Sequence, residues 1–178
     1  MDLSVLGVFV DEVIAQCEFA LMSMNDLREG LDQQDKKRVF YSAQAFLVAV
    51  ANLSKLFWPI EKHCFRGEEL RRLLEIEEDS SIRDRTLRHT YEHFDERIET
   101  WATRSSRRDY DDMNISIAGP LVPGIEPSDS MRNLECSPDR KTFKLIFHGV
   151  SYDPLIIEAE VRKVLEKAKR CSQRLWKR

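Results

Sequence analysis

A run of charged and imidazole side chains near the middle of the chain has the residue types needed for acid–base chemistry on a phosphate. Arg88 and His93 are separated by four residues, and two of the four histidines lie in this run. An imidazole titrates near neutral pH and can take up or release a proton, while a planar guanidinium matches the oxygens of a phosphate group. Such a pair is suited to metal-independent cleavage of RNA, in which a base takes the 2′-hydroxyl proton and a cation stabilises the phosphorane.

His89, Glu92 and Arg97 lie beside this pair in the sequence and are candidate substrate-binding residues. A simpler interpretation stays open. Arg88 and Glu92 are four residues apart, as are His93 and Arg97. That spacing is typical of ordinary pairs on a solvated helix surface.

The histidines also raise the alternative of a metal site. His89 and His93 are four residues apart and could ligate a metal together with Glu92 or Glu96. However, no third ligand is fixed by the spacing, and the sequence contains neither HExxH nor a paired ExxH motif. We therefore expect no metal ion and no other cofactor.

The element that must position these residues is predicted to be one long helix from Ser80 to Arg104. Ser80 or Ser81 can cap its first turn, and Asp84 can reach back as in a capping box. Apolar residues recur at steps of four and three and predict a stripe that faces a core. These residues are Leu87, Tyr91, Phe94, Ile98 and Trp101.

A straight helix does not bring the two candidate catalytic residues together. Five positions along a helix correspond to about 140° of rotation, which places Arg88 and His93 on opposite shoulders of the core stripe. Convergence requires a kink in the helix or a two-fold dimer in which each helix presents its shoulder to the other. The residues alone leave both open; the expectation of a homodimer comes from the family resemblance described next.

The segment Leu87 to Trp101, LRHTYEHFDERIETW, resembles the Arg-polar-x3-His motif of the HEPN superfamily. It also looks like a bacterial HEPN subgroup in which an EHFDER segment follows the arginine. The resemblance implies an all-α nucleotide-binding or ribonuclease domain with the motif on a late helix. It further implies that His93 is the general base or acid, that Arg88 clamps phosphate, and that dimerisation places the motif in a shared cleft.

The sequence departs from the family pattern at two points. His89 follows the arginine where active members most often have asparagine, and a predicted β-hairpin is added to the basic bundle. Two hypotheses therefore stand side by side. One is a metal-independent ribonuclease of the toxin or defence type; the other is a non-catalytic helical module that recognises RNA, a nucleotide or a partner protein.

The remaining helices are predicted from apolar residues at steps of three and four. Residues 3–31 and 39–57 form two long helices joined by a polar turn, and the second ends near Trp58 because Pro59 follows. After an irregular link at residues 61–66, a short helix is expected at residues 67–77. Asp153 and Pro154 begin the last helix, which continues to Leu175. The predicted fold is mostly α, an antiparallel four- to five-helix bundle.

The bundle is interrupted at about residues 105–152 by a loop and a β-hairpin. Glycines and prolines break residues 105–130, where only a short strand at Asn114 to Ile117 is expected. Residues 132–136 and 142–148 flank a turn-forming run and predict the hairpin before the last helix. Its apolar face, formed by Phe143, Leu145 and Phe147, should pack on the helices.

Composition limits the remaining possibilities. The chain has 178 residues, which fits one domain spanning residues 1–178, and its net charge of −3 does not suggest nonspecific binding to nucleic acid. Four cysteines lie far apart without a CxxC pair, so a zinc ribbon or a disulfide framework is not expected. No signal peptide or membrane span is expected, and we predict a cytoplasmic protein.

Overall fold

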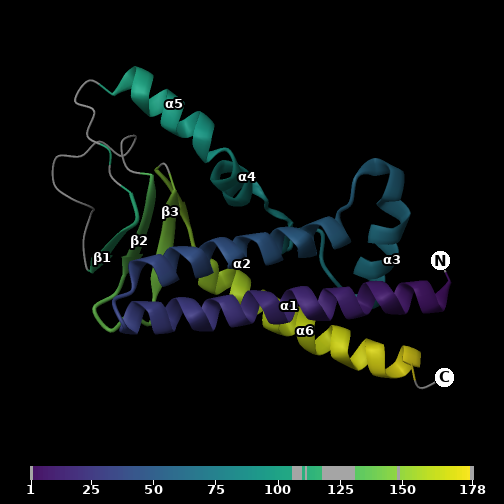
Figure 1. The fold of residues 1–178 in the computed structure, drawn as a ribbon. Helices are drawn as coiled ribbons and strands as arrows, with labels where there is room; N and C mark the ends of the chain where they lie inside the picture. Colours follow the sequence, from purple (N-terminus) through teal and green to yellow (C-terminus); the bar gives the residue numbers. More distant parts are fainter. Residues whose placement is uncertain (1, 106–109, 111, 118–130, 148, 177–178) are drawn as a thin grey trace. The chain divides into compact units, whose positions relative to one another are not determined.

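The structure, a computed structural model, describes residues 2–105, 110, 112–117, 131–147 and 149–176. It is mostly helical, as predicted, and a four-stranded sheet precedes the last helix (Figure 1). The helices are α1 (Leu3–Asp32), α2 (Lys36–Phe57), α3 (Cys64–Leu74), α4 (Thr86–Glu92), α5 (Phe94–Arg104) and α6 (Pro154–Trp176), with short 3-10 turns η1 (Glu61–His63) and η2 (Ser81–Arg83). The strands are β1 (Asn114–Ile117), β2 (Arg132–Cys136), β3 (Phe143–Phe147) and β4 (Val150–Tyr152).

The chain divides into two compact units. The first comprises residues 1–24, 45–85 and 156–178, and the second comprises residues 25–44 and 86–155. The candidate residues from Arg88 to Arg97 belong to the second unit, while the helical segments that cap and precede them belong to the first.

In the first unit, α1, α2 and α6 bury the apolar stripes that the sequence predicts. Asn52 of α2 donates to the Gln16 side chain of α1 at 3.2 Å, and Lys169 of α6 pairs with Glu18 at 2.7 Å. Leu3, whose side chain is 58% exposed, and the half-buried Cys171 and Leu175 near the end of α6 are exceptions. Buried stripe residues of this unit include Val10, Val13, Cys17, Ala20, Met24, Phe46, Val50, Leu53, Phe57, Val161, Val164 and Ala168.

The segment after α2 is more regular than predicted. The end of α2 at Phe57, before Pro59, is confirmed, but the irregular link expected at residues 61–66 is wrong. Helix α3 already begins at Cys64 and can lie close to the end of α2 because residue 67 is glycine. A Cβ at Gly67 would stand 2.5 Å from both the Phe57 carbonyl oxygen and the Pro59 ring.

In the second unit, the end of α1 and the start of α2 meet at a short turn in which Gln34 has a φ of 57°. Arg38 closes the turn by pairing with Asp26 at 2.8 Å and with Glu29 at 2.5 Å. The Asp35 side chain accepts from the Arg38 backbone N–H at 3.1 Å, which caps the first turn of α2.

The sheet of the second unit has the strand order β1-β2-β3-β4. Strands β2 and β3 are antiparallel, with Leu134 opposite Leu145, which confirms the predicted hairpin. The strand expected at Asn114 to Ile117 is confirmed as β1, and it pairs in parallel with β2. Strand β4, which was not predicted, adds antiparallel to β3. His148 and the glycines and prolines of residues 118–130 lie outside the described residues.

Helix α2 is the one described helix that is long and apolar enough, by length and composition, to cross a membrane. In its most apolar window, 61% of the residues are buried inside the protein. Burial of that kind is typical of a core helix, because a globular core removes the same apolar surface from water.

Candidate functional site

The candidate residues do not lie on one continuous helix, so the prediction of a single helix from Ser80 to Arg104 is wrong. The chain forms η2, an extended residue at Asp84, then α4 and α5. The predicted capping box is also replaced. Ser80 Oγ accepts from the backbone N–H of Ile82 at 3.3 Å, and the Ser81 backbone N–H donates to Glu160 of α6 at 3.0 Å.

Residues from distant parts of the sequence bind the segment just before α4 and keep it out of the helix. Arg85 Nε donates to Ser54 Oγ at 2.8 Å, and its Nη2 donates to the backbone oxygens of Ser54 and Trp58. Ser54 Oγ in turn donates to the Arg83 carbonyl oxygen at 3.1 Å. These charged hydrogen bonds to buried carbonyls outweigh the local helix propensity, because a continued helix would withdraw Arg85 from its partners.

A second interruption falls at His93, between α4 and α5. His93 has φ of −93° and ψ of 37°, while its neighbours on either side are helical. Its N–H still donates to the His89 carbonyl at 3.2 Å, and its own carbonyl accepts from the Arg97 N–H at 3.3 Å. The helical hydrogen bonds therefore continue through His93, while its backbone dihedral angles depart from helical values.

The side chains of Arg88 and His93 each meet a carboxylate and do not meet each other within the described part of the chain. Arg88 pairs with Glu92, and His93 Nδ1 lies 3.0 Å from Glu96 Oε1. The Arg88 side chain is 20% exposed and that of His93 is 42% exposed. The simpler interpretation of the sequence, an ordinary surface pair of Arg88 with Glu92, is therefore present in the structure.

The two histidines, by contrast, are brought together. The rings of His89 and His93 lie 4.4 Å apart between centroids, with 59° between their planes. Both imidazoles therefore stand on one side of the α4–α5 junction. Among the described residues, no group of three or more His, Cys, Asp or Glu side chains is arranged to hold a metal ion.

Two arginine nitrogens at this junction are buried without a hydrogen-bond acceptor in the described part of the chain. They are Nε of Arg88 and Nε of Arg97. A buried N–H donor that lacks a partner costs free energy, so native proteins satisfy nearly all of them. Both donors are of the type that binds a phosphate oxygen.

The sheet supports α4 through Tyr91 and Phe147, and through Arg132 and Asp112, which the sequence did not single out. Tyr91, which is 9% exposed, lies against Phe147 of β3 with 4.7 Å between ring centroids. Arg132 of β2 stands 5.9 Å over the Tyr91 ring and is held by Asp112, whose Oδ1 accepts from Arg132 Nε at 2.8 Å. The paired carboxylate of Asp112 raises the pKa of Arg132 above its usual range. Burial of Tyr91 agrees with its place in the predicted stripe.

The rest of that stripe is not a core face. Phe94 is 54% exposed and Ile98 is 36% exposed, and α5 contains no buried residue. Trp101 is only half-buried, against the Tyr110 ring at 4.9 Å. The Leu87 side chain lies outside the described residues. The expectation that Phe94, Ile98 and Trp101 face a core is therefore wrong; α5 is an amphipathic helix whose apolar side is open in the single chain.

The chain has been compared with family models, curated proteins and solved structures. None of the three comparisons gives a match. The site must therefore be interpreted from its own side chains. These are two contacting imidazoles, two arginines with open donors, and carboxylates that neutralise part of the charge.

Proposed function

We propose that the chain is a HEPN-like protein that interacts with RNA or a nucleotide and cleaves RNA without a metal ion as a homodimer. The observation that carries the proposal is the pair of buried, unpartnered guanidinium N–H groups of Arg88 and Arg97 next to the contacting His89 and His93 rings. Guanidinium donors bind phosphate, and a neighbouring imidazole moves a proton near neutral pH.

In the proposed reaction His93 takes the proton from the RNA 2′-hydroxyl and the 2′-oxygen bonds to phosphorus. The bond from phosphorus to the 5′-oxygen then breaks, and the protonated imidazole or water returns a proton to that leaving oxygen. Glu96 lies at Nδ1, so its carboxylate accepts Nδ1–H and leaves Nε2 as the nitrogen that takes the proton. Arg88 stabilises the charge that develops on the phosphorane once phosphate replaces Glu92 as its partner. His89 and Arg97 contact the flanking phosphates, which agrees with their place beside the pair.

A two-fold axis near the α4–α5 junction would complete such a site. The midpoint between residues 88 and 93 lies between residues 90 and 91. If the α4–α5 segments of two protomers cross antiparallel at that midpoint, Arg88 of one protomer lies opposite His93 of the other. The same crossing would cover Phe94, which is 54% exposed in the single chain. An exposed aromatic side chain beside the site supports a homodimer because dimer interfaces are enriched in such residues.

We further propose that the helices form an antiparallel bundle. In the first unit, α1 meets α2 through Gln16 and Asn52, and α6 meets α1 through Lys169 with Glu18 and Ser172 with Asp11. The later residue of α6, Ser172, contacts the earlier residue of α1, Asp11, which is the order that antiparallel helices give. Cross-linking of engineered cysteines along each pair tests the arrangement.

The test of the ribonuclease proposal is cleavage of a labelled single-stranded RNA in EDTA by the purified protein and its variants. Arg88→Ala and His93→Ala should each lower kcat by about 10²- to 10⁴-fold. The matched controls are Arg72→Ala and His63→Ala, which remove the same residue types from exposed positions on α3 and η1. Cleavage that survives either site variant, or falls equally in the controls, contradicts the assignment.

A non-catalytic binding module is the second candidate. It is favoured by His89 at the position after the arginine and by the Arg88–Glu92 pair, which neutralises the proposed phosphate clamp in the single chain. In that case purified protein shows no cleavage in EDTA, yet RNA raises its melting temperature, and above Kd the rise follows the logarithm of the RNA concentration. Arg88→Ala should remove that rise, and Arg72→Ala should not.

A further inference from the structure

The charged residues of α5 are divided between different sides of the helix. Arg97 and Arg104 are seven residues apart, which is nearly two full turns, so they project in nearly the same direction. His93 lies one turn before Arg97, whose backbone N–H donates to the His93 carbonyl oxygen at 3.3 Å. We call His93, Arg97 and Arg104 the basic flank of α5. It begins at the imidazole of the proposed cleavage site and runs to the other end of the helix.

The acidic residues of α5 lie away from the two arginines. Asp95 and Glu99 stand roughly 140° to 180° around the helix from them. The third acid, Glu96, lies between the two sides and is engaged with His93 at 3.0 Å. A helix with its side chains is about 10 Å across, whereas the Debye length at physiological salt is about 8 Å, so Asp95 and Glu99 weaken the field of the basic flank only in part. This side of α5 therefore stays positive although the helix as a whole does not.

Neither arginine of the basic flank is neutralised by a carboxylate within the described part of the chain. Arg97 is half-buried and its Nε has no acceptor, and Arg104 is exposed in the last turn of α5. Arg88 differs from them, because Glu92 is its partner. The planar guanidinium group presents several N–H donors that match the oxygens of a phosphate. The basic flank therefore offers two arginines to a ligand that carries phosphate groups in a row.

An aromatic pair lies directly beside the basic flank. Trp101 belongs to the apolar side of α5, between the directions of Arg97 and Ile98 around the helix. Its ring meets the Tyr110 ring edge to face, with 4.9 Å between centroids and 68° between planes, and Tyr110 is 43% exposed. In an edge-to-face pair one ring uses only its edge, so the other ring covers neither of its faces. Nucleobases of any sequence stack on such faces.

We propose that single-stranded RNA lies along α5, with phosphates on Arg97 and Arg104 and a base stacked on the pair formed by Trp101 and Tyr110. The inference rests on the proposed RNA-binding function and adds the path of the strand to it. An unpaired strand presents phosphates and open base faces side by side, whereas a duplex keeps its bases inside. An apolar protein surface in the same place would leave the Arg97 donor without an acceptor.

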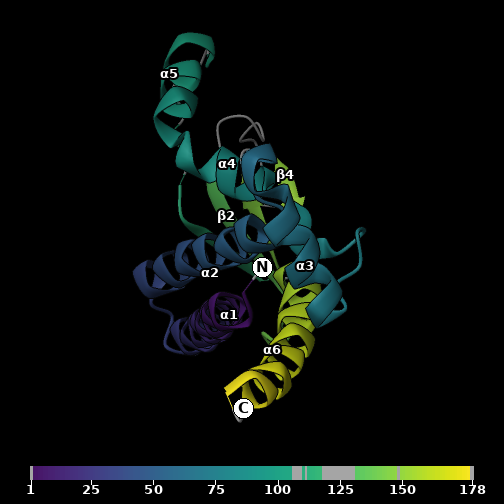
Figure 2. The same ribbon diagram turned by 90° about the vertical axis from the view of Figure 1, so that its right-hand side faces the viewer.

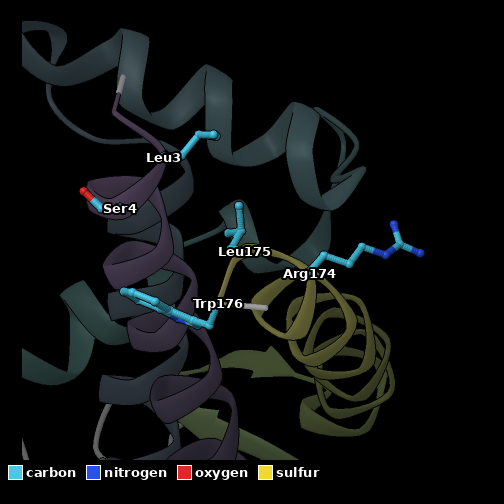
Figure 3. A pocket seen from close by; sticks show the side chains of 5 residues that line it. All are labelled: Leu3, Ser4, Arg174, Leu175 and Trp176. Atoms are coloured by element: carbon cyan, nitrogen blue, oxygen red, sulfur yellow. The ribbon is translucent and has the colours of Figure 1, made fainter. Parts of the chain in front are cut away.

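A hollow in the first unit is less suited to RNA. It measures about 390 Å³ and is lined by Leu3, Ser4, Arg174, Leu175 and Trp176. Figure 3 shows the Leu3 and Leu175 side chains pointing toward one another, while Arg174 extends away from them. The described lining of this hollow therefore offers mainly apolar surface, where a nucleic-acid strand needs cations for its phosphates.

The test uses the full chain and measures binding of a fluorescein-labelled single strand of about ten nucleotides by fluorescence anisotropy. Every sugar of this probe carries a 2′-O-methyl group, so the proposed cleavage cannot consume it. Arg104→Ala should reduce the slope of log Kd against log salt concentration by about 0.7, the value for one phosphate contact on a single strand. Arg72→Ala, at an exposed arginine of α3, is the control and should keep the slope. An unchanged slope in Arg104→Ala, or no binding of the probe, overturns the proposal.

A second measurement tests the stacked base. Trp101→Ala and Tyr110→Ala should each weaken binding of the probe about 5- to 150-fold, whereas Tyr41→Ala, at a ring of α2 that is 74% exposed, should not. An abasic strand of the same length should bind the variants as tightly as the wild type, because it has no base to stack. The melting temperature of each variant shows that it is folded. Unchanged binding of the probe, or equal losses for the probe and the abasic strand, overturns the proposal.

Sedimentation distinguishes RNA from a second copy of the chain as the occupant. If Trp101→Ala converts a dimer into a monomer and still binds the probe like the wild type, the aromatic pair is an interface between copies and the proposal is wrong. Cleavage distinguishes the strand path from the proposed ribonuclease activity. Probe binding that depends on Arg104 and Trp101 supports the path even where Arg88→Ala and His93→Ala leave cleavage unchanged. Cleavage that depends on Arg88 and His93 but not on Arg104 or Trp101 contradicts the path alone.

Discussion

Replacing Arg132 by methionine should destabilise the second unit, because it removes the cation that holds Asp112 and covers Tyr91. Arg132 Nε donates to Asp112 Oδ1 at 2.8 Å, and Nη2 donates to Asp112 Oδ2. The Asp112 side chain is only 13% exposed, so water cannot fully replace the lost donors. Methionine keeps most of the aliphatic volume of arginine, which limits the change to the loss of charge and hydrogen bonds.

The expected magnitude follows from those contacts. Leaving one member of a fully buried ion pair without its partner costs about 3 to 5 kcal/mol. Arg132 is 31% exposed, so part of this cost is already screened by solvent. We expect a loss of about 2 to 3 kcal/mol in the free energy of unfolding, which corresponds to a decrease in Tm of roughly 5 to 10 °C for a chain of this length.

Urea denaturation of Arg132→Met, Asp112→Asn and the double variant measures the coupling between the two side chains. If the pair contributes as described, the double variant is less destabilised than the sum of the single variants by at least about 1 kcal/mol. Arg104→Met, at an exposed arginine of α5 in the same unit, provides a control for loss of charge. A decrease in Tm below about 1 °C for Arg132→Met, or strict additivity of the two changes, refutes the reasoning.

Four further outcomes are expected. Gly67→Ala should lower the free energy of unfolding by about 1 to 3 kcal/mol in thermal melts, because its Cβ would stand 2.5 Å from the Phe57 carbonyl; an unchanged Tm contradicts the packing. Phe94→Gln should change stability by less than about 0.5 kcal/mol, because the ring is 54% exposed, yet should shift sedimentation from dimer toward monomer; a persistent dimer counts against the proposed axis. Burial raises the pKa of the Cys17 thiol to about 12, so at pH 8 a thiol reagent should label exposed Cys64 quickly and Cys17 only after unfolding. Because the unfolded thiol ionises at lower pH than the native one, Cys17 should also reduce stability as pH rises above about 9, and Cys17→Ala should remove that part of the pH dependence.

The long helices were predictable because their apolar period is unbroken and their ends carry local signals. Pro59 ends α2, and Asp153 accepts from the Leu155 N–H at 2.9 Å at the start of α6. The hairpin was predictable for the same reason, since alternation and a turn-forming run lie next to each other in sequence. Pairing of β1 with β2 was not, because a parallel pair joins strands across a long connection and leaves no local signal.

The region from Ser80 to Arg104 shows where periodicity is insufficient. Its spacing correctly identifies the apolar side of α4 and α5, but spacing alone cannot tell which residues a core will cover. Helix α5 extends away from the sheet in both views (Figures 1 and 2), and Phe94 and Ile98 stay exposed. The break before α4 depends on Ser54 and Glu160, which lie tens of residues away in the sequence. Arg88 and His93 stay a prediction from spacing, and spacing had no means of finding Arg132 with Asp112.

The interruption at His93 has a consequence for how the proposed chemistry could be controlled. The His93 ring contacts His89 of α4 and Glu96 of α5, so a change in the angle between these two helices would change the direction of the imidazole. Hinge and proton carrier would then be the same amino acid. Replacing His93 would remove the hinge and the proton carrier together. Substitutions farther along α5, at side chains that contact neither the substrate nor the imidazole, would test the effect of the helix angle on cleavage separately.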